Sequence, residues 1–283
     1  MASKCTRPIL RWHGGKWVTA PWIIAHFGPH HRYVEPFGGA WSVGFRKDPA
    51  EKEVWNDLDA ELVNLMSVLR GRRSAKELIR QVSLTPFARD EFLAAYEPAE
   101  EPIERARRLL VRSFMGHGSD GASGQYRTGF RCSTSRAGPS YASEWAGMKN
   151  SLWQAAERLA QVIIENRPAI EVMAKHDAAD TLHYVDPPYL PSTRARSNRR
   201  TDNGGVYRHE LSHEQHLELL AFLMELEGMV VLSGYPSEIY DTELEGWMRV
   251  ERPALKEGGL PATEVLWLNE RAQAALGAGP LFR

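Results

Sequence analysis

Four consecutive residues, Asp186-Pro187-Pro188-Tyr189, combine a carboxylate, two rigid rings and an aromatic side chain. Asp186 can accept a hydrogen bond from an exocyclic amine, the Pro187 carbonyl can accept a second, and Tyr189 can stack on a planar ring. Two acceptors on one amine hold its hydrogens and aim its lone pair at an electrophile. The tetrapeptide therefore predicts a pocket for a planar, amine-bearing ring. The plain alternative is a proline-stiffened turn whose tyrosine packs on the core.

The stretch before this motif, Thr181 to Val185, predicts the strand that positions it. Its β-branched and aromatic residues favour a buried strand, and the two prolines that follow can neither donate to a sheet nor continue the pleat. The motif is therefore expected at the carboxyl end of a strand. In open α/β sheets, ligands bind at that edge.

A second group of residues predicts a nucleotide-binding βα unit early in the chain. A strand at 31–35 leads into Pro36-Phe37-Gly38-Gly39-Ala40 and a helix expected over 41–46. Asp57 follows the strand-like residues 53–55, at the tip of a second strand, where an acid can bind both hydroxyls of a ribose. Because a full GxGxxG pattern is absent, an adenosine ligand without phosphates fits better than a dinucleotide.

Near the start of the chain, Trp12-His13-Gly14-Gly15-Lys16 places two glycines between a tryptophan and a lysine. The glycines permit a tight turn and close approach by a ligand, and Lys16 can meet an anionic group. Alone this signal is weak, since a loop glycine pair with a solvated lysine explains it equally well.

The remaining patterns predict a mostly parallel sheet with covering helices, interrupted by an insertion. Helices are expected at 60–69, 153–160 and 212–227, and further strands at 162–166, 229–235 and 263–268. Between about residues 71 and 148, charged helical patches alternate with a loop rich in glycine, serine and arginine. A long irregular loop inside a compact domain is usually functional or mobile, so we interpret this region as an inserted module.

The net charge of −1 conceals two stretches rich in arginine. Residues 104–136 contain seven arginines against Glu104 and Asp120, and residues 194–208 contain five against Asp202. Local basic surfaces on a neutral protein favour contacts with phosphates. The alternative is that these arginines are solvated on loops.

Within the first stretch, aromatic and basic residues are interleaved: Tyr126, Arg127, Phe130, Arg131 and Arg136. Such interleaving is expected of a nucleic-acid contact surface.

The chain has only two cysteines, Cys5 and Cys132, and they are far apart in the sequence. They indicate neither a disulfide framework nor a cysteine metal site, and they favour a reducing, cytoplasmic setting. No stretch is long and apolar enough for a membrane span.

His209-Glu210-Leu211-Ser212-His213 matches the HExxH pattern of zinc proteases. That chemistry needs both histidines on one face of an established helix. Ser212 and Gln215, however, form the signature of a capping box, so the helix is expected to begin after Ser212, with His209 outside it. We therefore expect no metal.

Taken together, these motifs resemble those of Dam-like DNA adenine-N6 methyltransferases in order and in approximate spacing, over about Arg11 to Asn269. The chain looks most like the orphan, phage and prophage members. The resemblance implies an α/β fold with a Rossmann-like S-adenosylmethionine-dependent methyltransferase sheet of seven strands, one of them an antiparallel edge strand. It also implies an inserted, mainly helical and loop target-recognition domain. The expected divisions are 1–70 for cofactor binding, 71–150 for the inserted DNA-binding module and 151–283 for the catalytic part.

The resemblance also assigns roles to individual residues. Trp12 and Lys16 match the amino-terminal cofactor motif, with Lys16 near the methionine carboxylate, and Phe37 and Gly39 match the turn under the methionine moiety. Asp57 matches the ribose-binding acid. Asp186 and Tyr189 match the catalytic motif, with Asp186 also close to the cofactor. For the cofactor's adenine, the candidates are Glu165 and Asn166.

The implied activity is site-specific transfer of a methyl group from S-adenosylmethionine to the exocyclic N6 of an adenine flipped out of double-stranded DNA. We expect a monomer that needs no metal and no membrane. The expected DNA contacts are Arg127, Arg131, Arg136, Arg194 and Arg196.

Three alternatives remain open at this stage. An N4-cytosine methyltransferase uses the same logic, because cytosine also carries an exocyclic amine. A methyltransferase acting on protein glutamine or on an RNA amine gives the basic aromatic insertion a less obvious role. A catalytically silent DNA-binding regulator of the same fold would bind DNA and transfer nothing.

Overall fold

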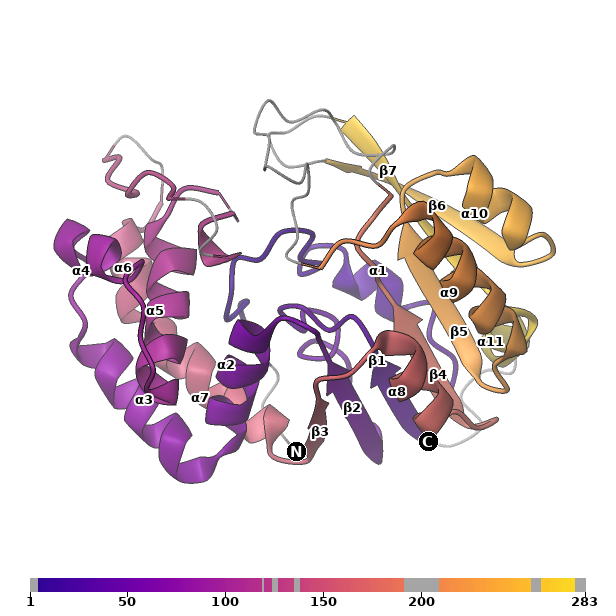
Figure 1. The fold of residues 1–283 in the computed structure, drawn as a ribbon, viewed down its shortest axis with the longest axis horizontal. Helices are drawn as coiled ribbons and strands as arrows, with labels where there is room; N and C mark the ends of the chain where they lie inside the picture. The colour runs from indigo at the N-terminus through magenta and orange to yellow at the C-terminus, as the bar shows by residue number, and fades with distance from the viewer. Residues whose placement is uncertain are drawn as a thin grey trace. The chain divides into compact units, whose positions relative to one another are not determined.

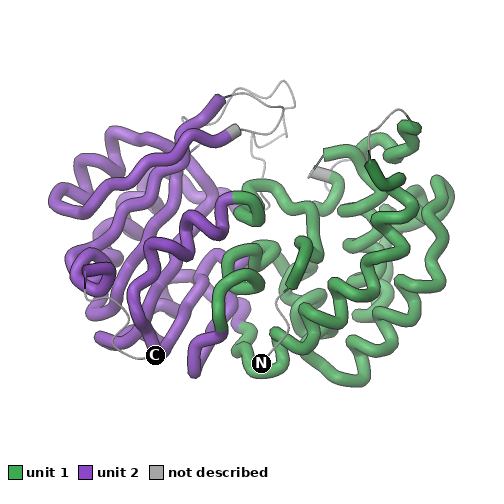
Figure 2. The backbone as a smooth tube through the Cα atoms, turned by 180° about the vertical axis from the view of Figure 1, so that it is seen from behind, with its two compact units in different colours: residues 1–18, 39–48, 59–164 green, residues 19–38, 49–58, 165–283 purple. Residues whose placement is uncertain are grey.

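A computed structural model of the chain describes residues 5–118, 120–123, 127–134, 138–190, 209–255 and 261–277. The chain folds into two compact units (Figure 2). Unit 1 comprises Met1–Val18, Gly39–Asp48 and Asp59–Ile164, and unit 2 comprises Thr19–Gly38, Pro49–Leu58 and Glu165–Arg283.

Within the described residues, seven strands form one sheet in the order β3-β2-β1-β4-β5-β7-β6 (Figure 1). They are β1 (Arg32–Glu35), β2 (Lys52–Asn56), β3 (Val162–Glu165), β4 (Thr181–Val185), β5 (Met229–Gly234), β6 (Met248–Leu255) and β7 (Pro261–Leu268). β1 pairs in parallel with β2 and β4, and β4 pairs in parallel with β5. β7 runs antiparallel to both β5 and β6. The α/β sheet is confirmed, but the antiparallel strand lies one position inside the edge, because β6 forms a hairpin with it and is outermost.

The helices of unit 1 are α2 (Ala60–Arg70), α3 (Arg72–Leu84), α4 (Arg89–Ala94), α5 (Pro102–Met115), α6 (Tyr141–Ala146), α7 (Met148–Leu159) and the 3₁₀ turn η1 (Asp120–Ser123). Unit 2 contains α1 (Ala20–Ile24), α8 (Ala169–His176), α9 (His213–Glu225), α10 (Glu238–Glu243) and α11 (Glu270–Gly277). In unit 1, α2, α3, α5 and α7 pack on one another (Figure 1). Their shared core is apolar and includes Leu62, Leu78, Leu109 and Leu152.

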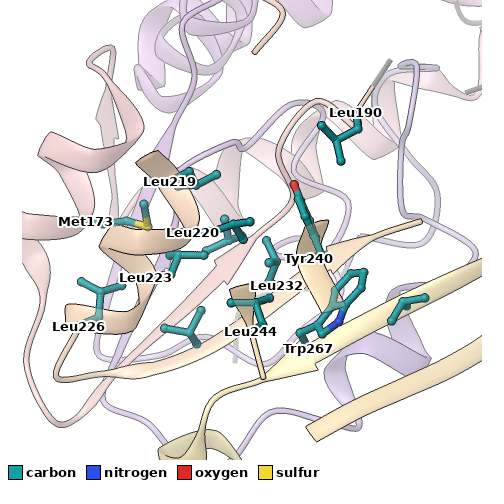
Figure 3. Close-up of a cluster of buried hydrophobic side chains, with 13 residues drawn as sticks. Met173, Leu190, Leu219, Leu220, Leu223, Leu226, Leu232, Tyr240, Leu244 and Trp267 are labelled. Atoms are coloured by element: carbon teal, nitrogen blue, oxygen red, sulfur yellow. The ribbon is translucent and has the colours of Figure 1, made fainter. Parts of the chain in front are cut away.

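One face of the sheet in unit 2 is covered by α8, α9 and α10 (Figure 3). Strand register places Val185, Leu232 and Trp267 side by side on this face, because Val185 pairs with Leu232 and Leu232 with Trp267. The helices bury the following residues against them: Met173, Leu219, Leu220, Leu223 and Tyr240. Each fully buried side chain of this kind stabilises the fold by roughly 1.5–3 kcal/mol. This group is called the sheet-face cluster below.

The opposite face carries the alternate residues of the same strands, among them Tyr33 and Tyr184. Phe27, which follows α1, packs on both rings, with centroid distances of 5.9 Å to Tyr33 and 5.7 Å to Tyr184. Because side chains of a strand alternate between faces, Ser233 also belongs to this second face. The face therefore mixes aromatic and polar side chains.

The prediction of a helix over residues 41–46 is wrong, because these residues form turns. Trp41 has a φ of 53°, far from the value near −63° that an α-helix needs. Its indole is fully buried and lies so close to Gly44 that a Cβ there would be 2.1 Å from the ring nitrogen. The packing of Trp41 thus overrides the local helical pattern.

The other expected elements are confirmed with small shifts at their ends, including the helix that begins after Ser212. Ser212 is the N-cap of α9, and its side chain and that of Gln215 form the expected capping box. Within the described residues, no helix has the length and apolar character needed to cross a membrane.

Candidate active site

Asp186-Pro187-Pro188-Tyr189 follows β4 directly, at the carboxyl end of a strand that is buried along its whole length. β4 lies between β1 and β5 in the sheet, so the motif has a parallel strand on each side. Pro187 and Tyr189 are buried, whereas Asp186 is half-buried. The expected position of the motif is confirmed, and its backbone is held inside unit 2.

The Asp186 carboxylate is hydrogen-bonded to the end of the neighbouring strand. Ser233 Oγ, on β5, donates to Asp186 Oδ1 over 2.7 Å, and Tyr184 Oη lies 3.1 Å from the same Ser233 oxygen. Burial, together with the nearby Asp186 charge, raises the pKa of Tyr184 well above its usual range. Tyr184 therefore stays a neutral hydroxyl beside an acidic group.

Tyr189 is also held from another strand. Its hydroxyl donates to Glu264 Oε2 on β7 over 2.9 Å, and its ring meets that of Tyr235 edge-on, with centroids 4.5 Å apart. Burial, followed by the charges of Asp186 and Glu264, raises the pKa of Tyr189 well above its usual range. The ring is thus packed on the core, as the plain alternative proposed, and it is also fixed in one orientation.

Asn56, at the end of β2, joins three segments of unit 2. Its side-chain nitrogen donates to the carbonyls of Pro36 and Arg167, each over 2.9 Å, and its side-chain oxygen accepts from the Arg167 N–H over 3.0 Å. Its main-chain carbonyl accepts from the Gly38 N–H over 2.7 Å. The residue that follows, Asp57, is therefore fixed beside the turn after β1.

The glycines of that turn are required by close packing and by backbone conformation. A Cβ on Gly38 would lie 2.1 Å from Nε1 of Trp55, which is fully buried. Gly39 has a φ of 48°, in the left-handed region that favours glycine. Phe37 packs against the sheet-face cluster, to which Leu190, the residue after Tyr189, also belongs.

Glu165 and Asn166, the two candidates for the cofactor's adenine, point to different partners. Glu165 accepts a hydrogen bond from Lys175 over 2.8 Å, and this bond is the main reason that the pKa of Glu165 is lowered. Asn166 Nδ2 donates to the carbonyl of Asp57 over 2.7 Å. The structure therefore brings Asn166, rather than the Glu165 carboxylate, against Asp57.

The remaining cofactor candidates, Trp12, Lys16 and Gly39, belong to unit 1. Gly14 has a φ of 70°, which confirms the glycine turn, and Lys16 Nζ donates to the Gly14 carbonyl over 2.9 Å. Lys16 is buried. A Cβ on Gly39 would lie 3.4 Å from the ring of Trp12, so these residues form a compact group within their own unit.

The arginines of α5 are bound within unit 1. Their partners are Glu61 for Arg105, Glu91 and Glu104 for Arg107, Glu104 for Arg108, and the carbonyl of Ala95 for Arg112. These contacts hold α5 to α2 and α4. This part of the arginine-rich stretch therefore does not form the basic surface that the sequence predicts, because Glu61, Glu91 and Glu104 pair with Arg105, Arg107 and Arg108.

The five arginines expected to contact DNA differ in their surroundings. Arg131 is buried, with its guanidinium 3.8 Å from the ring centroid of Tyr141. The Arg127 side chain is 65% exposed and lies 3.3 Å from Glu97. Arg136, Arg194 and Arg196 lie outside the described residues, as does Tyr126.

Phe130, the other aromatic residue of this loop, packs on α4 and the segment before it. Its ring centroid lies 5.1 Å from that of Phe87 and 5.8 Å from that of Phe92. The guanidinium of Arg89 lies 5.0 Å from the Phe130 ring. Phe130 thus anchors the loop to the helices of unit 1.

The HExxH residues lack the helical placement that zinc chemistry needs. His213 is the first residue of α9, Ser212 caps that helix, and His209 precedes it. In the part of the chain that the structure describes, no group of three or more histidine, cysteine, aspartate or glutamate residues can hold a metal ion.

Sequence analysis missed Ser233, Glu264 and Asn56 as site residues. Each is a buried polar residue within a strand: Asn56 ends β2, Ser233 is next to the last residue of β5, and Glu264 lies in the middle of β7. Because a buried polar group needs a partner, that pattern is a usable signal. It does not say which partner, since Ser233 is 47 residues from Asp186 and Glu264 is 75 residues from Tyr189.

Comparisons with known proteins match most of the chain. A family profile described as D12 class N6 adenine-specific DNA methyltransferase matches residues 12–235. The DNA adenine methylase of Escherichia coli (strain K12) is 25% identical over 266 residues, which cover 90% of this chain and 92% of that protein. The DNA adenine methylase of Serratia marcescens is 26% identical over 245 residues, which cover 83% and 86%. The profile match includes Ser233 and ends before Glu264.

Proposed function

Because the chain belongs to the D12 class N6 adenine-specific DNA methyltransferase family, we propose that it methylates adenine N6 in double-stranded DNA, with S-adenosylmethionine as the methyl donor. The proposed active site lies at the carboxyl ends of the strands of unit 2. One observation carries the assignment of the catalytic residues. The Asp186 carboxylate, held by Ser233, and the Tyr189 ring, held by Glu264, come from one rigid motif at the carboxyl end of β4.

The residues at the neighbouring strand ends fit an adenosyl ligand. Asp57 offers a carboxylate for the two ribose hydroxyls, and Asn166, whose amide already contacts the Asp57 carbonyl, lies next to it for the adenine ring. Phe37 and the turn at Gly38 and Gly39 fit the methionine moiety, because no side chain projects from these glycines. Glu165 has a weaker claim, since its carboxylate is bound to Lys175.

From unit 1, we assign Lys16 to the methionine carboxylate and Trp12 to contact with the methionine chain. The turn that carries them is stabilised by the positive φ of Gly14 and by the bond from Lys16 to the Gly14 carbonyl. A lysine in such a glycine turn is suited to an anionic group. Bound S-adenosylmethionine supplies a methyl group on a sulfonium sulfur, whose bond to that carbon breaks as N6 forms its own.

The protein's own contribution is to hold the amine. The flipped adenine stacks on Tyr189 and donates its two N6 hydrogens to the Asp186 carboxylate and the Pro187 carbonyl. These contacts aim the N6 lone pair, and N6 returns to neutrality by losing one proton to solvent. Because the methyl donor is already activated, catalysis consists mainly of orientation.

Residues 71–150 are proposed as the target-recognition module, between a cofactor-binding part at 1–70 and a catalytic part at 151–283. Arg127 is an exposed arginine of this module and is assigned to a DNA phosphate, together with Arg136, Arg194 and Arg196. Arg131 is placed to support the loop from inside. If Arg127 contacts a phosphate, Arg127→Ala weakens DNA binding at every sequence and lowers the salt slope by about one.

The test of the reaction is transfer of labelled methyl groups from S-adenosylmethionine to unmethylated genomic DNA, followed by nucleoside analysis. Label in N6-methyladenine is the expected result, and mapping the modified sites then gives the sequence specificity. Label in N4-methylcytosine would overturn the target base. Tight DNA binding without transfer would instead identify a silent regulator.

A further inference from the structure

Two buried side chains, Tyr184 and Ser233, lead to the half-buried Asp186 carboxylate. Tyr184 and Ser233 are fully or almost fully buried, and both lie on the sheet face opposite the sheet-face cluster. Val185 pairs with Leu232, so the next residues along these parallel strands, Asp186 and Ser233, lie level with each other. Two hydrogen bonds join Tyr184 to Ser233, over 3.1 Å, and Ser233 to Asp186, over 2.7 Å, in a chain of three side chains.

The direction of donation along this chain follows from the groups themselves. An ionised carboxylate only accepts hydrogen bonds, so Ser233 gives its single hydroxyl hydrogen to Asp186. Ser233 then has only lone pairs left for Tyr184, and the Tyr184 hydroxyl must be the donor. The raised pKa of Tyr184 agrees with a phenol that keeps its proton. Hydrogen bonds that run head to tail in this way strengthen one another.

Resting on the function proposed above, we infer that Ser233 is a positioning residue for methyl transfer and that Tyr184 acts through it. A bond to Oδ1 fixes the rotation of the carboxylate plane about the Cβ–Cγ bond, and thereby the directions in which both oxygens accept. The N6 amine must be held in line with the methyl group, so a carboxylate turned away from this orientation would lose aligned encounters. In this role Ser233 acts through Asp186.

A purely structural role would make a different prediction. If the chain only fastened β4 to β5, breaking it would lower stability and cofactor affinity along with the rate. A positioning role instead lowers kcat while the affinity for S-adenosylmethionine and the KM for DNA change little, because only the alignment in the transition state is lost.

The experiment measures kcat and KM on unmethylated DNA, the Kd for S-adenosylmethionine and the thermal midpoint, all with the full chain. Ser233→Ala removes the hydroxyl, and Ser233→Cys is a control of similar shape with a weak donor. We expect kcat to fall about 10- to 100-fold in both. Tyr184→Phe should give a smaller fall, and adding it to Ser233→Ala should cost no further rate, because the link is already broken.

Wild-type kcat in Ser233→Ala and Ser233→Cys would overturn the inference, as would a fall in kcat matched by equal losses of cofactor affinity and stability. If the falls in kcat caused by Tyr184→Phe and Ser233→Ala multiply in the double variant, Tyr184 does not act through Ser233. Failure of the proposed function looks different: the unmodified protein would then transfer no methyl group to adenine, whatever stands at 233.

Discussion

Around the amino end of β5, polar side chains bind mainly to main-chain groups, whereas beyond the carboxyl ends of β4 and β5 the side chains of the Asp186–Tyr189 motif bind to other side chains. Asp177 accepts from the N–H groups of Glu227 and Gly228, over 2.7 and 3.0 Å, as well as from His183. Asn269 accepts from Val230 N–H over 3.0 Å and donates to the Gly228 carbonyl over 2.9 Å. These bonds close the loops that precede and follow the strands.

At the carboxyl ends, the pairs Ser233–Asp186 and Tyr189–Glu264 join side chain to side chain. A bond to the main chain stabilises the path of the chain, so its loss is felt in folding. A bond between side chains mainly sets the orientation of one of them, so its loss is felt where that orientation matters. The same chemistry therefore serves stability at the amino end of β5 and alignment at its carboxyl end.

The largest expected effect is that of Asp186→Ala. Removing the carboxylate should reduce kcat by at least about 100-fold, because the amine loses one of its two acceptors. The Kd for S-adenosylmethionine should rise less, and the thermal midpoint should stay near that of the unmodified protein. Filter assays with labelled methyl donor measure the rate. A variant with near-normal transfer would contradict the catalytic assignment.

Next in size is Tyr189→Phe, which keeps the ring and removes the bond to Glu264. We expect kcat to fall roughly 10-fold, the scale of one hydrogen bond to a charged group. The matched variant is Glu264→Gln, which keeps an acceptor oxygen and should lose less. Steady-state kinetics on DNA with both variants decides the matter, and equal, large losses of thermal stability in both would assign Glu264 to folding instead.

At the amino end of β5, which Asn269 contacts, Asn269→Ala should destabilise the fold and spare the chemistry. The amide also accepts from the Ala272 N–H, so the change removes several buried bonds and should lower the free energy of unfolding by about 2–4 kcal/mol. The rate per folded molecule should be unchanged. Urea titration and kinetics on the same sample measure both, and a selective fall in kcat would break the contrast between the two ends.

The smallest effect is a pH dependence that traces to Asp177. Burial opposes its ionisation, but the bonds from His183, Glu227 and Gly228 outweigh burial, so the pKa of Asp177 is lowered from its ordinary value of 3.8. A lowered pKa in the folded state stabilises the protein above the unfolded value and loses that contribution as pH falls below it. Urea titrations below about pH 4 should therefore show falling stability, with a shallower dependence in Asp177→Asn.

The parts of the molecule that the sequence predicts well are those that depend on local signals. The double proline after a β-branched run, the glycines after β1 and the capping box at Ser212 each act within a few residues, and the structure has them where expected. The antiparallel position of β7 depends on packing between distant segments, and the buried ring of Trp41 likewise has a distant neighbour, the Arg158 guanidinium, 4.9 Å from the ring centroid. Local patterns carry no information on such packing.

For the arginines of α5, the electrostatic expectation fails for the same reason. Arg105 is bound by Glu61, 44 residues away, and Arg107 by Glu91, 16 residues away. A charge count over a window of sequence treats these arginines as unneutralised, because it cannot see acids on other helices. The sequence does not show that Ser233 and Glu264 are the partners of Asp186 and Tyr189, because these residues are far apart along the chain. It does show that Ser233 and Glu264 are polar residues in buried strands.

The contacts of Asn56 also bear on how such a protein can change over time. Its amide binds Arg167, 111 residues further along the chain, so both ends of the intervening segment are fastened within unit 2. These hydrogen bonds hold the two ends of the segment together whatever residues lie between Asn56 and Arg167. Helices can therefore be gained, lost or exchanged within that segment, which contains the module proposed to recognise DNA, while Asn56 and Arg167 keep their places.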